Sequence, residues 1–313
     1  MKPGDGYICF IVNPKSGAGS TRPLGRQFRQ YLAARGFDIH AHVTRSLEHA
    51  CELATDAAVD HDCALVVAVG GDGTVREVVR GLEGSDRPVL IVPGGTENLL
   101  ASELGIDAHL QTLIDVFESG HIQRLDLGIV NNRCFTSIAG FGFDGEIVRR
   151  VSERRKGHIT YADYVAPVWK TFWTYKYPAM TVTVDDKEFF SGRGLVFVGN
   201  IRRYGGGLRI LRDANRGDGL LDVCVFKTDS RLSLLRMTLL MLLRSHIGAK
   251  NVLYKRARTI TVTGDPAIRT QIDGDPGPAL PVHIKVIPAA VNCLAPKGAR
   301  PLGLRTRIKR IFG

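Results

Sequence analysis

The chain contains 313 residues, 44% of them hydrophobic and 23% charged, which is enough to bury a large core and excludes a disordered or low-complexity polypeptide. Its formal net charge of +11 indicates an anionic partner, and its aromatic residues do not stand among basic ones as a nucleic-acid stacking surface requires. We therefore expect a nucleotide and an anionic membrane surface as partners, and no nucleic acid.

The cysteines and the apolar runs indicate where the protein works. The six cysteines are scattered without C-x-x-C spacing, which is typical of reduced core residues in a cytoplasmic protein. The short polar stretch before Ile8 carries no secretory signal. The longest apolar run, Leu232 to Leu243, contains Arg236 and is shorter than the ~20 residues that span a bilayer. We expect a soluble cytoplasmic protein with peripheral membrane association.

Strands and helices alternate through the first half of the chain. The expected strands are Ile8–Val12, Phe37–Val43, Leu65–Val69 and Val89–Val92, and the expected helices are Arg22–Ala34, Leu47–Val59, Val75–Leu82, Thr96–Leu104 and Leu110–Glu118. Alternation of this kind is typical of right-handed βαβ units with a parallel sheet. We predict an α/β nucleotide-binding domain over residues 1–125.

From about Ile122 the pattern changes to short strands with few helices. The expected strands are Ile122–Val130, Cys134–Ala139, Ala179–Val184, Gly194–Gly199, Leu220–Phe226, Thr259–Thr263 and His283–Ile287. This pattern favours an antiparallel β-sandwich-like domain, which we place over residues 126–296. Two helices are expected within it, an aromatic-rich one over Tyr161–Tyr175 and one over Arg231–Ile247 that is apolar almost all round. Core burial explains such a helix, and lining an acyl-chain pocket is the alternative.

The stretch Gly70-Gly71-Asp72-Gly73-Thr74 lies between a buried strand and a helix. Glycine there permits a close approach to the backbone, and the start of the following helix favours an anion such as phosphate. The alternative is a tight turn that binds nothing. Asp72 favours the phosphate site, because an acid beside bound phosphate is expected where Mg²⁺ accompanies a nucleotide.

Two further small-residue turns follow strands, Asn13 to Gly19 and Pro93 to Asn98. The carboxyl ends of the strands in an open α/β sheet are where ligands bind, so we expect all three turns at one edge. The Walker pattern and G-x-G-x-x-G are both absent from these turns.

The motifs NPKSG, GGDGT, PGGTEN and, downstream, Gln271-Ile272-Asp273-Gly274-Asp275 occur in this order. Together they resemble the diacylglycerol kinase catalytic domain shared by soluble bacterial lipid kinases, sphingosine kinases and ceramide kinase. The resemblance covers nearly the whole chain, although NAD kinases also carry GGDGT. It implies an NAD kinase/diacylglycerol kinase-like fold and nucleotide contacts from Asn13, Thr44, Gly70, Gly71, Asp72, Gly73, Thr74 and Thr96. For Thr44, a helix N-cap is the alternative.

Asp273 follows a short strand, where the sequence by itself favours an ordinary turn aspartate. The resemblance implies instead that Asp273 is the general base that takes the proton from a lipid hydroxyl. Many relatives have glutamate where this chain has Asp275, whose side chain is shorter than the one that would make the relatives' magnesium contact.

The resemblance also implies two magnesium sites. Asp72 and Asp126 would lie near the ATP-associated Mg²⁺, where some relatives add an aspartate and this chain has Leu99. A hinge ion pair is the alternative for Asp126. A structural Mg²⁺ would bind the Asp218 carboxylate and main-chain oxygens of Asn215 and Leu220, for which a plain turn is the alternative.

We predict an ATP- and Mg²⁺-dependent lipid kinase of lipid metabolism and phospholipid biosynthesis, which transfers the γ-phosphoryl group to a diacylglycerol-like or sphingoid-like hydroxyl across an interdomain cleft. An NAD kinase-like phosphotransferase and a non-catalytic nucleotide or lipid sensor are the alternative functions. For the oligomeric state, a homodimer is one of the options. The basic tail, residues 297–313, has Leu304, Ile308, Ile311 and Phe312 at helical spacing. It favours an interfacial amphipathic helix, with a frayed terminus as the alternative.

Overall fold

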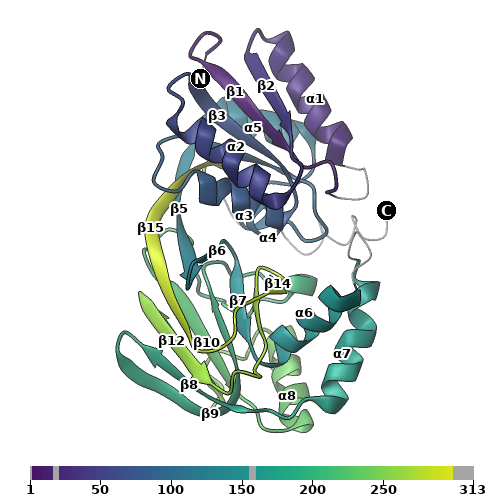
Figure 1. Cartoon of the computed structure of the whole chain (residues 1–313), viewed down its shortest axis with the longest axis vertical. Coiled ribbons are helices and arrows are strands. Elements are labelled where there is room, and N and C mark those ends of the chain that lie inside the picture. Colours follow the sequence, from purple (N-terminus) through teal and green to yellow (C-terminus); the bar gives the residue numbers. More distant parts are fainter. Residues whose placement is uncertain (1, 17–20, 155–159, 299–313) are drawn as a thin grey trace. The chain divides into compact units, whose positions relative to one another are not determined.

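The structure is a computed structural model that describes residues 2–16, 21–154 and 160–298. The chain divides into two compact units (Figure 1). Unit 1 consists of Met1–Leu125 and the chain from Ala289 onward, and unit 2 consists of Asp126–Pro288.

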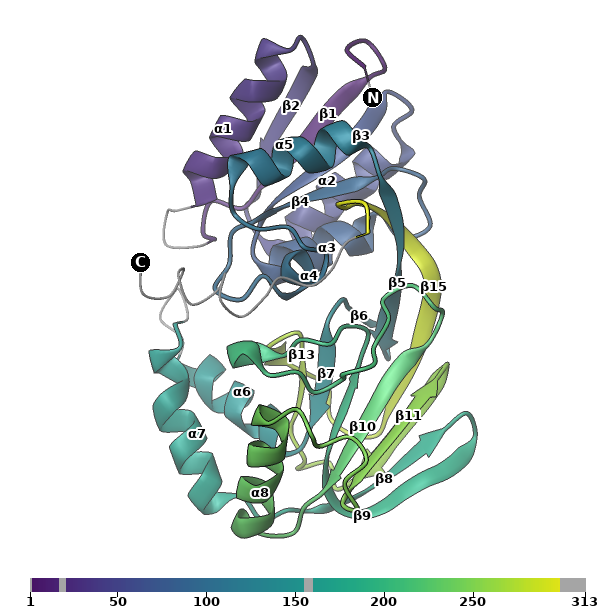
Figure 2. The ribbon, with the colours of Figure 1, turned by 180° about the vertical axis from the view of Figure 1, so that it is seen from behind.

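Unit 1 is built on four parallel strands in the order β2-β1-β3-β4. They are β1 (Tyr7–Val12), β2 (Asp38–Val43), β3 (Cys63–Gly70) and β4 (Val89–Pro93). The helices are α1 (Thr21–Ala34), α2 (Leu47–Val59), α3 (Asp72–Gly81), α4 (Leu99–Glu103) and α5 (Leu110–Ser119). Helices α1 and α5 cover one face of the sheet, and α2 and α3 cover the other (Figures 1 and 2).

The core of unit 1 follows from its β-branched strands. Ile8, Val67 and Leu90 lie in the central strands and are completely or almost completely buried, as parallel strands covered on both faces require. On one face, Phe28 of α1 contacts Phe10 of β1 and Phe117 of α5.

Unit 2 is a sandwich of mostly antiparallel strands. Its strands are β6 (Arg133–Phe135), β7 (Ile138–Phe141), β8 (Ala179–Val184), β9 (Lys187–Gly199), β10 (Leu221–Lys227), β11 (Val252–Ala257), β12 (Thr259–Gly264), β13 (Thr270–Ile272) and β14 (Asp275–Pro276). Two strands cross the border between the units, β5 (Ile122–Val130) and β15 (Val282–Leu294). The predicted fold class, an α/β domain with a parallel sheet and a β-sandwich-like domain, is confirmed.

Strand β9 joins the two layers of the sandwich, because its first half pairs with β8 and its second half with β7 and β10. A hydrophobic core lies between the layers and includes Val182, Val196 and Ile260. A second core lies on the other face of β9 and β10, where α8 (Arg231–Leu242) buries Met237 against residues such as Phe226.

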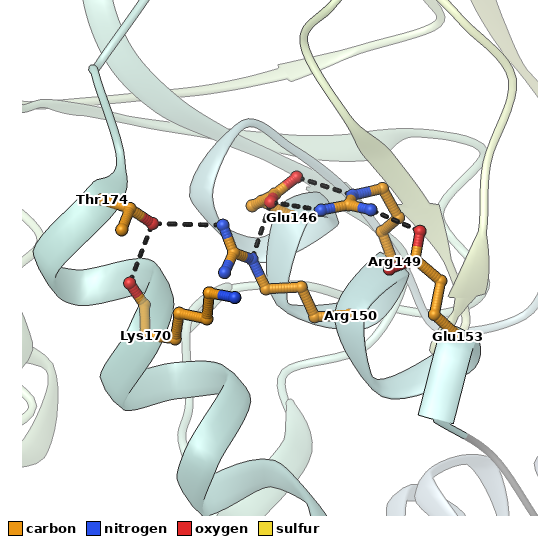
Figure 3. A network of polar contacts seen from close by, with 6 residues as sticks. All are labelled: Glu146, Arg149, Arg150, Glu153, Lys170 and Thr174. Carbon is orange, nitrogen blue, oxygen red and sulfur yellow. Dashed lines mark hydrogen bonds and ion pairs between the residues drawn. The ribbon is translucent and has the colours of Figure 1, made fainter.

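Three helices lie beside the strands of unit 2, namely α6 (Phe143–Arg154), α7 (Ala162–Thr174) and α8 (Figures 1 and 2). Figure 3 shows how α6 holds α7. Glu146 accepts hydrogen bonds from both Arg149 and Arg150, and Arg150 Nη2 also donates to Thr174 Oγ1 at 3.1 Å. Thr174 in turn donates to the Lys170 carbonyl at 2.8 Å, so the last turn of α7 is fixed on α6.

Several expected elements differ from the observed ones. Helix α3 begins at Asp72 and not at Val75, so Asp72 to Thr74 form its first turn. The helix expected over Thr96–Leu104 is the short α4, because Asn98 adopts the left-handed conformation with a φ of 50°. The expectation of few helices in unit 2 missed α6, whose acid-rich first turn and Gly145 are typical of a loop.

Among the described residues, no helix is long and apolar enough to cross a membrane. The six cysteines are free thiols, and all but the half-buried Cys51 are buried, as the sequence predicts.

Candidate functional site

The predicted nucleotide-binding residues of unit 1 follow four strand ends. Val12, the last residue of β1, is level with Val43 of β2 and Val69 of β3 in the sheet register. Strands β3 and β4 also end level with each other. The structure therefore brings to one edge of the sheet the segments that carry Asn13, Thr44, residues 70–74 and Thr96.

Two glycines at this edge lie backbone against backbone. A Cβ atom on Gly71 would lie 3.0 Å from the Cα atom of Gly95, and a Cβ atom on Gly95 would lie 2.8 Å from the Cα atom of Gly71. A side chain this close would require the backbone to shift at Gly95 and to give slightly at Gly71, so packing by itself favours glycine at both positions. These two glycines are explained without a ligand.

The start of α3 is different, because no side chain caps it. Its N-cap residue is Gly71, and the first turn contains Asp72. The leading N–H groups of a helix lack intrahelical partners, and together with the helix dipole they favour an anion. A Cβ atom on Gly73, also in this turn, would meet nothing closer than Leu47 Cδ1 at 3.7 Å. Packing therefore leaves open space beside Gly73.

Hydroxyl and amide groups surround this helix start. Asn13 Nδ2 donates a hydrogen bond to Thr74 Oγ1 at 2.7 Å, which joins the end of β1 to the first turn of α3. Thr44 and Thr74 are buried, and Thr96 is exposed. The helix N-cap alternative for Thr44 is wrong, because Ser46 caps α2 by accepting the His49 N–H at 3.1 Å.

Asp72 is bound to the start of α4. Its Oδ1 atom accepts the N–H of Leu99 at 2.6 Å. Leu99, which stands where some relatives have an aspartate, therefore contacts Asp72 through its own backbone N–H. This contact does not depend on the Leu99 side chain. An acid in the first turn of α3 is also stabilised by the helix dipole.

In unit 2, the Asp273 carboxylate is held by the loop before β7. Oδ2 accepts from Thr136 N at 2.9 Å and from Thr136 Oγ1 at 3.2 Å, and Oδ1 accepts from the backbone N–H groups of Ser137 at 2.9 Å and Ile138 at 3.1 Å. Asp273 itself is in the left-handed conformation, with a φ of 49°. Asp273 therefore has a structural contact that an ordinary solvated turn residue lacks, because its carboxylate binds the backbone of residues 136–138.

A buried acid that the sequence reading missed lies next to this turn. Asp144, at the start of α6, accepts a hydrogen bond from the Tyr204 hydroxyl. A Cβ atom on Gly140 would lie 2.1 Å from Asp144 Oδ2 and 2.8 Å from Gln271 Nε2, so the carboxylate and the amide face each other over a glycine. The Gln271 side chain also accepts the Gly274 N–H at 2.8 Å. Gln271 therefore lies between Asp144 and the Asp273 turn; its Nε2 atom donates to the Ile138 carbonyl at 3.4 Å, and Asp144 Oδ2 has no hydrogen bond within the described residues.

Burial raises the pKa of Asp144 to about 6, although the Tyr204 hydroxyl and the Gln271 amide each lower it. The pattern Gly140 to Gly145, which places an acid between glycines after a strand, is the sequence signal that marks Asp144. Like the GGDGT turn, it places an aspartate directly before a glycine.

Asp126 is buried and holds the loop that precedes β10. Its Oδ2 atom accepts the Gly219 N–H at 2.6 Å, and its backbone N–H donates to the Arg216 carbonyl at 2.8 Å. It belongs to unit 2, so the predicted position beside Asp72 and a nucleotide-bound Mg²⁺ stays a prediction.

The predicted structural metal site lies in the same loop. Asp218 accepts the Leu220 N–H at 3.2 Å and forms an ion pair with Arg256 at 3.2 Å, while Asn215 is exposed. Burial raises the pKa of Asp222 to about 6, the Tyr254 hydroxyl lowers it, and the charge of Asp218 raises it further. Asp222 Oδ2 is buried and accepts no hydrogen bond within the described part of the chain.

In the ranges 2–16, 21–154 and 160–298, there is no group of three or more His, Cys, Asp or Glu side chains that would hold a metal. The predicted site uses one carboxylate and two carbonyl oxygens, so this finding does not bear on it. Gly17 to Gly19 of the first motif and tail residues 299–313, with Leu304, Ile308, Ile311 and Phe312, lie outside the described residues.

Comparison with known proteins matches both halves of the chain. Residues 7–130 match the family described as "Diacylglycerol kinase catalytic domain", and residues 137–295 match the "YegS C-terminal NAD kinase beta sandwich-like domain". A protein named diacylglycerol kinase from Mycobacterium tuberculosis is 31% identical over 298 residues, which cover 93% of this chain and 96% of that protein. The chain belongs to the diacylglycerol kinase family. The predicted resemblance is confirmed.

Other family members cover the chain to a similar extent. A diacylglycerol kinase from Bacillus subtilis is 27% identical over 92% of this chain and 96% of that protein. A protein named probable lipid kinase YegS from Shigella dysenteriae is 30% identical over 92% of this chain and 95% of that protein. These matches support a lipid kinase.

A solved structure has the same fold. The crystal structure of a diacylglycerol kinase from Bacillus anthracis str. Sterne gives a TM-score of 0.70 at 21% identity and covers 94% of this chain and 98% of that one. At this identity the likeness shows the fold only.

Proposed function

We propose that the protein is an ATP- and Mg²⁺-dependent lipid kinase that transfers the γ-phosphoryl group of ATP to a lipid hydroxyl. The observation that carries this proposal is the start of α3 in a diacylglycerol kinase family member, where an uncapped helix start with space at Gly73 is surrounded by hydroxyl and amide groups. Phosphoryl transfer depends mainly on positioning and on charge stabilisation, and such an edge supplies both.

The residues of this edge fit a nucleotide phosphate. The N–H groups at the start of α3 would bind phosphate oxygens, and Thr74 and Thr96 would add hydroxyl donors, with Asn13 and Thr44 beside them. Asp72 would hold Mg²⁺, which neutralises charge on the transferring group when it is bound. Because Leu99 donates its N–H to Asp72, the Asp72 carboxylate has a fixed orientation.

Asp273 would orient the lipid hydroxyl in unit 2. Each carboxylate oxygen accepts two hydrogen bonds, and the longest of the four comes from the Thr136 hydroxyl at 3.2 Å. In this proposal, the lipid hydroxyl replaces the Thr136 hydroxyl on Oδ2 and donates its proton there as the phosphoryl group is transferred. The three backbone N–H bonds hold the carboxylate in place during the exchange.

The loop that carries Asp218, which Asp126 of β5 holds in position, would accommodate a structural Mg²⁺. Carboxylate and carbonyl oxygens are the ligands that Mg²⁺ prefers, and Asp218 with the carbonyl groups of Asn215 and Leu220 would supply them. A cation would offset the negative charge around the buried Asp222. Asp126 would keep this loop in position through Gly219.

The test is incubation of the purified protein with γ-labelled ATP and Mg²⁺ against diacylglycerol, sphingoid bases, prenols and NAD, with the products separated by chromatography. Label in a lipid phosphate supports the proposal. Labelled NADP would show an NAD kinase-like enzyme instead, and nucleotide binding without transfer to any acceptor would show a sensor. A Thr136→Val variant tests the exchange at Oδ2, since it should fold and still transfer phosphate.

A further inference from the structure

Helices α7 and α8 expose large apolar side chains to solvent. On α8, the exposed leucines include Leu232 at 78% and Leu239 at 56% exposure. On α7, Trp169 is 64% exposed and Trp173 is 47% exposed. Scattered exposed apolar residues need no explanation, but a contiguous group marks an interaction site. We call this group the α7–α8 surface; it consists of Val165, Val168, Trp169, Trp173, Leu232, Leu235, Leu239, Leu242 and Leu243.

The spacing of these residues shows that the surface is a second apolar face and not an incomplete core. On α8, Leu235 and Leu239 are exposed, whereas Leu234, Met237 and Met241 are buried in the core over β9 and β10. At 3.6 residues per turn, the two sets lie on opposite sides of the helix. The expectation that α8 is buried all round is therefore wrong for half of its circumference.

Helix α7 follows the same rule. Val165, Val168, Trp169 and Trp173 are exposed on one face, while Thr171 is buried toward the rest of unit 2. The two indole rings contact each other at a centroid distance of 5.7 Å, which keeps them together on that face.

The two helices are joined at the edge of this surface. The Arg231 guanidinium, at the start of α8, lies 4.9 Å from the Trp173 ring centroid and donates a hydrogen bond to the Trp173 carbonyl at 2.6 Å. The other end of the contact is fixed as well, because Arg150 of α6 holds Thr174 (Figure 3). Figures 1 and 2 show α7 and α8 as neighbours within unit 2. The apolar side chains are thus presented by a preformed scaffold.

Charge around the surface is mainly positive. Lys170, Arg231, Arg236 and Arg244 are all exposed on or near the two helices, and the exposed acids there are Asp163 on α7 and Asp229 just before α8. Two copies of such a surface would repel each other. An anionic bilayer interface, in contrast, accepts leucines into its acyl boundary, tryptophans at the head-group level and basic side chains at the lipid phosphates.

We propose that the α7–α8 surface docks the protein on an anionic phospholipid membrane. The choice of a membrane rests on the proposed function, since a kinase with a lipid acceptor must reach a bilayer and no helix among the described residues can cross one. Basic residues near an anionic leaflet each contribute about fivefold to partitioning, equivalent to about 1 kcal/mol. Docking should therefore weaken as salt rises.

Tryptophan fluorescence can report on the docking of this surface. Trp169 and Trp173 are its two tryptophans, and both belong to the surface. Phosphatidylglycerol vesicles should shift the tryptophan emission of the full-length protein to shorter wavelength, and lipids brominated on the acyl chains should quench it. Phosphatidylcholine vesicles should have a much weaker effect, because they lack the negative charge.

Two variants and one control sharpen the measurement. The Leu235→Glu/Leu239→Glu double variant should lower vesicle partitioning by more than about tenfold, and Arg236→Gln should lower it about fivefold. Val59→Glu, at a 73% exposed apolar position on α2 of unit 1, is the matched control and should bind like the parent protein. Because all four positions are exposed, thermal unfolding should be nearly unchanged.

Vesicle binding with unchanged tryptophan emission would overturn the proposal, because contact would then come from another part of the chain such as the basic tail. Equal partitioning of the double variant and the parent would overturn it too. These outcomes are separate from the kinase activity. Docking without phosphate transfer would contradict the proposed kinase function and support the docking surface. Phosphate transfer to a short-chain soluble acceptor without docking would support the kinase function and contradict the docking surface.

Discussion

Two turns of similar composition, Gly70 to Thr74 in unit 1 and Gln271 to Asp275 in unit 2, place an aspartate beside glycine in different ways. Asp72 lies in the first turn of a helix, and its Oδ1 atom accepts the N–H of Leu99 at 2.6 Å. Asp273 lies in a left-handed turn between two short strands and accepts four hydrogen bonds from residues 136–138.

The difference shows that an aspartate next to a glycine can serve two physical purposes. In the first turn, glycine allows backbone packing and a helix start without a side-chain cap, which leaves polar N–H groups for a ligand. In the second turn, the Asp273 carboxylate accepts the backbone N–H groups of residues 136–138, which lie far away in the sequence. A ligand at the first turn would use the backbone, and at the second it would have to replace an existing hydrogen bond.

The largest expected effect is at Asp273. Asp273→Asn retains the size of the side chain but turns one acceptor oxygen into a donor that faces backbone N–H groups. Phosphate transfer should fall about 10²–10⁴-fold, as loss of a general base typically causes. The variant should also lose about 3 kcal/mol of unfolding free energy, because buried N–H groups lose a charged acceptor.

Steady-state turnover at saturating lipid and urea unfolding measure these two effects separately. Asp275→Asn is the control and should change both less, since Asp275 is assigned only to a positioning or metal contact. Near-normal turnover of Asp273→Asn would make Asp273 a purely structural residue, and Asp126 would be the next carboxylate to test.

The second prediction concerns pH and the acid behind the Asp273 turn. Because the pKa of Asp144 rises from 3.8 unfolded to about 6 folded, the native state binds more protons between these values. Its contribution to stability is therefore complete below about pH 4 and is lost as pH rises through 6, a change of about 3 kcal/mol.

Denaturant unfolding from pH 4 to pH 7.5 would show this contribution as a difference between the parent protein and Asp144→Asn. The variant should have a flatter stability profile, because asparagine does not titrate. Parallel profiles for both proteins would mean that Asp144 does not carry the predicted linkage.

The third prediction separates packing from ligand space in the first turn. Gly71→Ala should lower unfolding free energy by about 1–3 kcal/mol, because its Cβ would lie 3.0 Å from the Gly95 backbone. Gly73→Ala should raise unfolding free energy by about 0.5–1 kcal/mol, since alanine is favoured over glycine within a helix and meets only Leu47.

Calorimetric titration with ATP·Mg²⁺ then tests the role of the space at Gly73. Weaker binding in a Gly73→Ala protein that is more stable than the parent places the phosphate at the start of α3. Unchanged affinity in the same protein would place the nucleotide elsewhere.

The smallest effect is expected at the hydrogen bond between Asn13 and Thr74. Thr74→Val removes the hydroxyl that accepts from Asn13 Nδ2 at 2.7 Å and should cost about 1 kcal/mol of unfolding free energy. A double-mutant cycle with Asn13→Ala, followed by thermal unfolding, measures the coupling. A coupling energy near zero would show that the two strand ends are not joined through this bond.

The sequence by itself determined the fold class, the positions of the strand ends and the family. Apolar runs followed by small-residue turns predicted strands of a parallel sheet, and the sheet register brings the segments with Asn13, Thr44, Thr74 and Thr96 to one edge. These are local features of composition and period, and local features can be read along the chain.

Tertiary structure alone decided what each side chain contacts. The four donors to Asp273 come from residues more than 130 positions earlier, and Asp144 lies near the same turn, with Gln271 between them, only because β7 and β13 pair. In the same way, the sequence of α8 is apolar on all sides and does not indicate which leucines are exposed. The core over β9 and β10 covers one face of the helix, and the opposite face is exposed to solvent. Hydrogen-bond partners and burial depend on which distant segments meet, and that is fixed by packing.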